Sequence, residues 1–243
     1  MPRFSVVIPV RNEAAAIVAL CESVQRVLRG LSAPFEIVVA DDGSDDGTLD
    51  RLRTLAGTAP LRVVILEGRQ GQAAALQAGF ESSRGPILVT LDGDGQNDPE
   101  DVPRLLSRLD EGYDVVCGWR RDRRDPPAKR LASRLANAAR VLLTGDTVHD
   151  VGCTLRVLRR EAWRPIYLSG GLHRYFVALA ARYGSRIAEV EVRHHPRRSG
   201  ASKYGLLDRL LQGSADLLKV LRLDPARPMA RVPEYRVREV LDL

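Results

Sequence analysis

Five short apolar runs, rich in valine and isoleucine, alternate with helix-compatible segments along the first half of the chain, and no other feature restricts the fold as strongly. The runs lie at 4–10, 35–40, 61–66, 86–91 and 113–118. Helical patterns lie between them, near 13–29, 71–83 and 99–111. Because strands joined by helical crossovers pair in parallel with right-handed connections, this alternation predicts an α/β fold with a mostly parallel sheet flanked by helices.

The second half of the chain has a looser pattern. We expect a helix over 128–143, a strand over 151–158, a helix over 173–183 and a strand over 186–193. No internal repeat or low-complexity tract divides the sequence, so 1–223 is predicted to form a single domain. The last 20 residues, 224–243, contain three prolines and are expected to form a poorly packed C-terminal tail.

Composition narrows the class of protein without identifying it. Of the 243 residues, 44% are hydrophobic and 28% are charged, as in an ordinary globular protein. No apolar run is long enough for a transmembrane helix, the N-terminus lacks a signal-peptide pattern, and the three widely spaced cysteines favour reduced thiols, so we expect a cytoplasmic location. The formal net charge of +6 indicates an anionic partner, which is a nucleic acid, a membrane surface or a phosphorylated substrate.

Two acidic turns follow strands of the predicted sheet. One is DDGSDDGT at 41–48, and the other is LDGDGQNDPED at 91–101. Both turns lie at the carboxyl edge of a parallel sheet, where ligands bind in such folds. Carboxylates separated by one residue, as in Asp92 and Asp94, suit a hard divalent cation, Mg²⁺ or Mn²⁺, that is shared with substrate phosphates. The alternative is a polar strand-to-helix loop in which Asp98 or Asp101 caps the next helix.

Seven motifs, in this order, resemble those of the family-2 glycosyltransferases of GT-A fold, and within them the dolichyl- or polyprenyl-phosphate mannose synthase-like branch. They are VVIPVRNE (6–13), DDGSDDGT (41–48), GQAAALQAGF (71–80), LDGDGQNDPED (91–101), SRLAN (133–137), DVGCTLRVLRR (150–160) and RRSGASKY (197–204). The resemblance covers nearly the whole chain and implies the GT-A, Rossmann-like fold of nucleotide-diphospho-sugar transferases. The chain departs from the common motifs at Arg11, Gly93, Gly95 and Thr154-Leu155, which bears on the sugar and the acceptor.

The resemblance implies an inverting, metal-dependent transfer of a hexose from a nucleotide sugar to a polyprenyl or dolichyl phosphate. Mannose is favoured and glucose comes next, with a donor of GDP-mannose or UDP-glucose type. The residues implied to bind the nucleotide sugar are Pro9, Val10, Glu13, Asp41, Asp42, Gln72, Asp92, Asp94 and Gln96. Of these, Asp92, Asp94 and Gln96 would also hold Mg²⁺ or Mn²⁺, whose charge stabilises the diphosphate leaving group.

Basic residues in the second half are candidates for binding the acceptor. A phosphate monoester has a second pKa of ~6, so it is largely dianionic at neutral pH and needs positioning more than deprotonation. We therefore assign Arg120, Arg134 and Ser133, together with Asp94, to the catalytic site, and Arg198 and Lys203 to acceptor-phosphate binding. The alternatives are a solvated basic face and a nucleic-acid patch, and the second is disfavoured because no recognition motif accompanies the charge.

Residues 204–223 have an amphipathic pattern. Their leucine stripe consists of Leu206, Leu207, Leu210, Leu211, Leu217, Leu218 and Leu221. The stripe predicts either a helix packed on the core or an interfacial helix that brings the site to a lipid acceptor at the inner face of the membrane. The second possibility makes the protein peripheral to that membrane.

Two other functions stay open. One is a transferase of the same fold that acts on a soluble or polysaccharide acceptor, and the other is a non-catalytic subunit that binds nucleotide sugars. The intact set of Asp92, Asp94 and Gln96 argues against the second. A nicotinamide-dependent dehydrogenase is disfavoured, because no Gly-x-Gly-x-x-Gly follows the first strand. The sequence does not indicate an oligomeric state.

Overall fold

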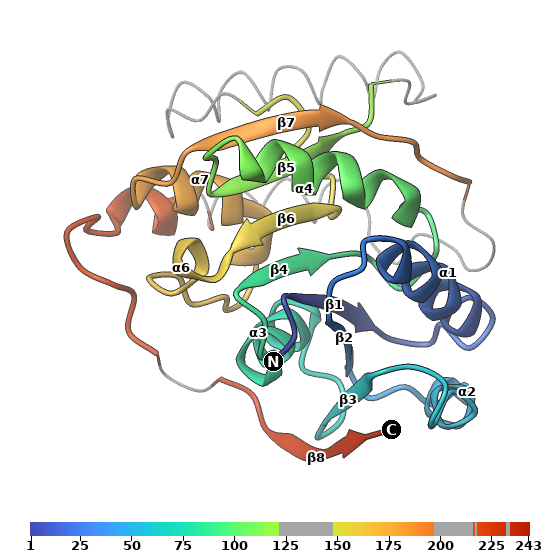
Figure 1. The fold of residues 1–243 in the computed structure, drawn as a ribbon. Coiled ribbons are helices and arrows are strands. Elements are labelled where there is room, and N and C mark those ends of the chain that lie inside the picture. Colours follow the sequence, from blue (N-terminus) through green and yellow to red (C-terminus); the bar gives the residue numbers. More distant parts are fainter. Residues whose placement is uncertain (122–147, 197–215, 217, 232–233) are drawn as a thin grey trace.

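In the computed structural model, the described residues are 1–121, 148–196, 216, 218–231 and 234–243. Their strands form one eight-stranded sheet in the order β7-β5-β6-β4-β1-β2-β3-β8 (Figure 1). The strands are β1 (Phe4–Val10), β2 (Phe35–Asp41), β3 (Leu61–Leu66), β4 (Ile87–Thr90), β5 (Val115–Trp119), β6 (Arg156–Arg159), β7 (Ile187–Glu191) and β8 (Val237–Asp242). Strands β4, β1, β2 and β3 pair in parallel, as do β5 and β7, whereas β6 and β8 are antiparallel to their neighbours. The mixed α/β sheet confirms the predicted fold class.

Helices cover both faces of the sheet (Figure 1). They are α1 (Ile17–Gly30), α2 (Thr48–Arg53), α3 (Gln72–Ser82), α4 (Val102–Asp110), α6 (Arg160–Trp163) and α7 (Phe176–Arg182), with short 3₁₀ turns η1 (Pro99–Asp101) and η2 (Leu172–Tyr175). Buried side chains of α1, α2 and α4 form one hydrophobic cluster with the sheet, and those of α3, α6 and α7 form a second. The parallel strands are buried on both faces, which is why they read as continuous apolar runs.

The predicted strands of the first half are all present, with one change in arrangement. β5 does not pair with β4, because β6 lies between them and runs antiparallel to both. β6 is also shorter than the predicted strand 151–158. Helix α1 begins at Ile17 rather than near residue 13, because residues 14–16 form a turn in which Ala16 N–H and Ile17 N–H both donate to Glu13 O at 3.0 Å.

Within the expected C-terminal tail, residues 237–242 form a strand whose side chains are mostly exposed. These residues form β8, which pairs antiparallel with β3 at the edge of the sheet. The buried Arg62 of β3 donates through Nε to Asp242 Oδ1 at 2.7 Å and through Nη1 to Ser82 O at 2.7 Å. The chain therefore returns to its N-terminal half through a contact that spans 180 residues.

The leucine stripe at 204–223 is described only near its C-terminal end, and the predicted helix 128–143 lies outside the described residues. Residues 218–222 are helical, with Val220 buried in the core and Leu218 53% exposed. Arg182 donates to Leu221 O and Leu223 O, so it holds the end of this helix. In the portion of the chain that the structure describes, no helix is both long and apolar enough to cross a membrane.

Candidate active site

The loop after β4 brings two carboxylates together. Asp92 lies two residues beyond the last residue of the strand, Thr90, and Asp94 is 7% exposed. Gln72, at the start of α3, donates through Nε2 to Asp92 Oδ1 at 3.0 Å. A Cβ on Gly93 would lie 2.6 Å from Val10 Cγ1, so glycine is the residue that fits where this loop passes the end of β1. The loop is thus held against the nucleotide-binding motif predicted at the carboxyl end of β1.

The electrostatics of this loop favour a bound cation. Burial, followed by the neighbouring carboxylate of Asp94, raises the pKa of Asp92 to about 6. A cation beside Asp92 and Asp94 would offset the unfavourable energy of ionising Asp92. Among the described residues, no three His, Cys, Asp or Glu side chains converge as a metal cluster. The predicted set is different, because it joins two carboxylates to the amide of Gln96, and these oxygen donors suit Mg²⁺ or Mn²⁺ with further oxygens from substrate.

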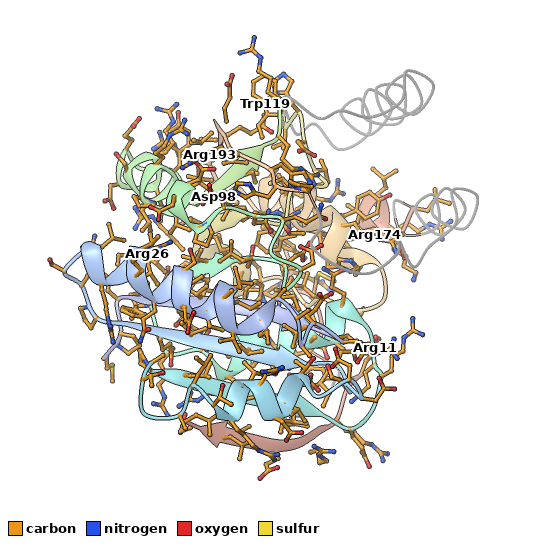
Figure 2. The ribbon with its side chains drawn as sticks, turned by 90° about the vertical axis from the view of Figure 1, so that its right-hand side faces the viewer. Arg11, Arg26, Asp98, Trp119, Arg174 and Arg193 are labelled. Atoms are coloured by element: carbon orange, nitrogen blue, oxygen red, sulfur yellow. The ribbon has the colours of Figure 1, made fainter. Side chains whose placement is uncertain are left out.

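Residues that follow β7 dock on the acidic loop. Arg193 N–H donates to Asp101 Oδ2 at 2.7 Å, and Arg193 Nε lies 3.3 Å from Asp98 Oδ2, a proximity that Figure 2 shows. His195 Nε2 also lies 3.1 Å from Asp98 Oδ2. Asp98 caps η1 by accepting from Glu100 N–H, so the alternative of a helix-capping aspartate is correct for this residue. In the same loop, Asp94 Oδ1 accepts from Gln96 N–H at 3.1 Å.

Gln96 is fixed by the same segment. Its Nε2 donates to His195 O at 3.3 Å and lies 3.4 Å from His194 Nε2, while His195 N–H donates to Gln96 O at 2.9 Å. Because the amide nitrogen faces this segment, the amide oxygen is directed elsewhere and is the atom that would bind a cation. The sequence did not identify the 193–195 contacts, whose only signal was the adjacent pair of histidines.

The first two aspartates of the second acidic turn, Asp41 and Asp42, have different hydrogen-bond partners. Asp41 is fully buried at the end of β2, where its Oδ1 accepts from Ser44 N–H at 3.0 Å. No described residue hydrogen-bonds to its Oδ2, which is also buried. Asp42 instead accepts from Gln70 N–H at 2.5 Å and from Gly71 N–H at 2.9 Å. Of these two predicted nucleotide-binding residues, Asp41 is therefore the one with an acceptor oxygen to offer.

The first and second motifs hold each other in place. Asn12 Nδ2 donates to Asp45 Oδ1 at 2.7 Å, and Asp45 N–H donates back to Asn12 Oδ1 at 3.0 Å. Glu13 N–H donates to Thr48 Oγ1 at 3.0 Å. In the predicted set, Pro9 and Val10 end β1 beside Ala40 and Asp41. The predicted nucleotide-binding residues of both motifs consequently come together at one edge of the sheet.

Arg120, which was predicted to bind the acceptor phosphate, already has a carboxylate partner within the protein. Its guanidinium forms a two-pronged ion pair with Asp150, from Nε to Oδ2 at 2.7 Å and from Nη2 to Oδ1 at 2.9 Å. The other residues predicted to act on the acceptor, Arg134, Ser133, Arg198 and Lys203, lie outside the described residues. Whether they join Arg120 thus stays a prediction.

Arg156 is a site residue that the sequence did not identify. It begins β6 opposite Thr90, is 5% exposed, and its positive charge lowers the pKa of Asp92 against the larger opposing effect of burial. Its Nη2 donates to Val151 O at 2.9 Å, and its guanidinium carbon lies 5.8 Å from the centre of the Phe176 ring. The motif 150–160 contains Arg156, but nothing in the pattern distinguishes it from the partly buried Arg159 and Arg160.

Comparison with known proteins gives the family. The family described as Glycosyl transferase family 2 matches residues 5–166. An undecaprenyl-phosphate 4-deoxy-4-formamido-L-arabinose transferase of Pseudomonas paraeruginosa is 40% identical over 230 residues, which is 94% of this chain and 68% of that protein. A dodecaprenyl-phosphate galacturonate synthase of Rhizobium johnstonii is 38% identical over 223 residues, which is 89% of this chain and 66% of that protein. This chain thus spans about two thirds of the length of these relatives.

Solved structures agree on the fold. Glucosyl-3-phosphoglycerate synthase of Mycobacterium tuberculosis, in complex with Mn²⁺, UDP and glucosyl-3-phosphoglycerate, superposes with a TM-score of 0.70 at 24% identity over 92% of this chain and 81% of that one. The same enzyme with Mn²⁺, UDP and phosphoglyceric acid gives 0.67 at 26% identity, over 92% and 80%. These similarities confirm the predicted GT-A fold. Together with the match over residues 5–166, they show that the chain belongs to glycosyl transferase family 2.

Proposed function

We propose that this glycosyltransferase moves a sugar from a nucleotide sugar to a polyprenyl phosphate. The observation that carries the proposal is the pairing of Asp92 with Asp94 after β4, together with the buried Oδ2 of Asp41 at the end of β2, to which no described residue hydrogen-bonds. Two relatives at 38–40% identity are named for transfer to undecaprenyl or dodecaprenyl phosphate, which supports the lipid acceptor.

The donor would lie along the edge of the sheet. Asp41 would accept a hydrogen bond from the nucleoside, and Asp92, Asp94 and Gln96 would hold Mg²⁺ or Mn²⁺. When bound, the cation supplies charge that stabilises the departing diphosphate. The tuberculosis enzyme at 26% identity, solved with Mn²⁺ and UDP, supports this arrangement. The nucleotide is of GDP-mannose or UDP-glucose type, and the UDP complex favours the second.

The acceptor phosphate is the nucleophile. One of its oxygens attacks C1 of the sugar, the bond from C1 to the diphosphate oxygen breaks, and the nucleoside diphosphate leaves with the electron pair. A single displacement of this kind inverts the configuration at C1. Because the phosphate is already ionised, the protein has to position it, and Arg120, Arg134, Ser133, Arg198 and Lys203 are proposed for this task.

The motifs favour mannose and then glucose, whereas the two relatives are named for a formamido-pentose and for galacturonate. We also propose that residues 1–223 form the catalytic domain, and that the helix near 218–222 contacts the inner face of the cytoplasmic membrane. The exposed Leu218 supports this contact, while the buried Val220 ties the helix to the protein core.

The test is a matrix of donors and acceptors analysed by mass spectrometry. The purified chain is incubated with Mn²⁺, a short polyprenyl phosphate and, in turn, GDP-mannose, UDP-glucose, UDP-galacturonate and a UDP-pentose. Polyprenol without phosphate and 3-phosphoglycerate serve as control acceptors. We expect a glycosylated polyprenyl phosphate with at least one donor and no product from polyprenol. Product on phosphoglycerate without any lipid product would overturn the lipid assignment and favour a soluble acceptor.

A further inference from the structure

The end of β5 carries a buried, two-pronged ion pair. Arg120 and Asp150 have side chains that are only 12% and 9% exposed, and the Arg120 backbone N–H also donates to Asp150 Oδ2 at 3.2 Å. Burying two opposite charges gives little net stability, because the loss of hydration offsets their attraction. Stability of the fold therefore does not explain why the Arg120–Asp150 pair is buried.

Asp150 is itself held by the neighbouring strand β7. Glu189 accepts from the backbone N–H of Asp150 at 3.2 Å and from that of His149 at 2.9 Å. His149 Nδ1 lies 2.7 Å from the second Glu189 oxygen, and the His149 ring stacks on Trp119, with 4.7 Å between ring centres and planes 20° apart. The backbone hydrogen bond to Glu189 thus fixes Asp150, while the Asp150 carboxylate pairs with the Arg120 guanidinium. We call Arg120, Asp150 and Glu189 the Arg120 clamp.

The ion pair with Asp150 leaves most of the N–H donors of the Arg120 guanidinium for other partners. Arginine has five N–H donors, and Asp150 uses one on Nε and one on Nη2. The three that remain, two of them on Nη1, lie on the edge away from Asp150. The carboxylate of Asp92 interacts electrostatically with this guanidinium, so Arg120 lies close to the acidic loop of the site. A planar cation held in this way is suited to a phosphate oxyanion.

We propose that Asp150, held by Glu189, is a positioning residue for Arg120, and that the remaining donors of Arg120 bind a phosphate oxygen of the reactants. The inference rests on the proposed function, since it assumes transfer between phosphate-bearing substrates. The oxygen belongs either to the acceptor phosphate or to the leaving diphosphate, which share the same chemistry. Removing the Asp150 charge should then slow sugar transfer only because Arg120 is no longer held in position. Once Arg120 has been replaced, the same change in Asp150 should have no further effect.

The experiment is a double-mutant cycle with Arg120→Lys and Asp150→Asn, using Glu191→Gln as the matched control. Glu191 pairs with Arg121 at 2.8 Å on the exposed side, one residue along from the clamp. Arg120→Lys keeps the charge but loses the fork, and we expect a fall in kcat on the order of 10²-fold. Asp150→Asn should cost roughly tenfold or more, and the double variant should be no slower than Arg120→Lys alone. Glu191→Gln should match wild type.

Donor binding separates the two sources of the oxyanion. Unchanged calorimetric affinity for the nucleoside diphosphate, with slower transfer, assigns the oxygen to the acceptor, whereas loss of both assigns it to the leaving group. If Asp150→Asn does not fold, as judged by circular dichroism, Glu189→Gln replaces it in the same cycle. Wild-type speed in these variants, or effects that multiply in the double variant, would overturn the inference. Absence of lipid product from the wild-type protein would instead contradict the proposed function.

Discussion

Asp41 and Asp42 are adjacent in the sequence, yet substituting Asp42 should lower stability, whereas substituting Asp41 should lower nucleotide affinity. Asp42→Ala removes the acceptor of Gln70 N–H and Gly71 N–H, which are held at 2.5 and 2.9 Å. Each partly buried donor left without an acceptor costs about 1–2 kcal/mol. The free energy of unfolding should therefore fall by about 2–4 kcal/mol. This is a large part of the total for a typical domain, which is about 5–15 kcal/mol. Asp42→Asn keeps one carbonyl oxygen and should lose about half as much.

Asp41→Asn is the matched substitution. Its amide oxygen can still accept from Ser44 N–H, so the change places an NH₂ group where the unpaired Oδ2 now lies. A donor at that position repels the N–H or O–H of a nucleoside, and affinity for nucleoside diphosphate should fall about tenfold or more, or roughly 1.4 kcal/mol. Urea unfolding followed by circular dichroism gives the stability, and calorimetry gives the affinity. An unchanged urea midpoint in Asp42→Ala, or wild-type nucleotide affinity in Asp41→Asn, would refute the division of roles.

Three further predictions follow from burial and charge. Burial, followed by nearby arginine charges, lowers the pKa of His173 to about 4, so the free energy of unfolding should decline as pH falls from about 6.5 to 4 because the unfolded chain alone gains the proton. This slope, on the order of 2 kcal/mol, should vanish in His173→Gln measured by urea unfolding across that range. Leu218→Ser should weaken salt-sensitive binding to anionic liposomes without loss of stability, whereas Val220→Ser should destabilise the fold, and equal binding by Leu218→Ser would exclude the membrane contact. Asp242→Ala should speed hydrogen exchange in β8 by removing the partner of buried Arg62, and unchanged exchange would contradict that anchor.

The sequence predicts the parallel part of the fold well because that part is coded locally. β1 to β4 are apolar runs bounded by turn residues, and they are buried on both faces whatever their neighbours. The carboxyl-edge position of both acidic turns follows from this alternation alone. Asp92 and Asp94 could therefore be assigned to a site before any contact was known.

Elements that depend on distant partners could not be read in the same way. β8 has a charged, proline-flanked sequence, and it becomes a strand because β3 offers an open edge and Arg62 offers a partner for Asp242. Residues near Asn12 resemble a helix start, but hydrogen bonds to Asp45 hold them in a loop. In both cases a contact made across the fold overrides the local pattern.

The candidate site shows the same limit. Asp42 was predicted to line the nucleotide pocket together with Asp41, and only the backbone of residues 70–71 reveals its scaffold role. Arg120 reads as one of several arginines, and its distinction comes from Asp150, 30 residues later. Residue type and spacing indicate which groups are available, whereas their roles depend on partners that the fold supplies.

The central claim is that the acidic loop after β4 holds a nucleoside diphosphate through a divalent cation. Its most direct test is calorimetry of UDP and GDP binding to the wild-type protein and to Asp94→Asn, each with Mn²⁺ and with EDTA. We predict that wild type binds one nucleotide on the order of 10²-fold more tightly with Mn²⁺, and that Asp94→Asn loses this difference while remaining folded. Equal affinity with and without Mn²⁺ in wild type, or an undiminished Mn²⁺ effect in folded Asp94→Asn, would contradict the claim.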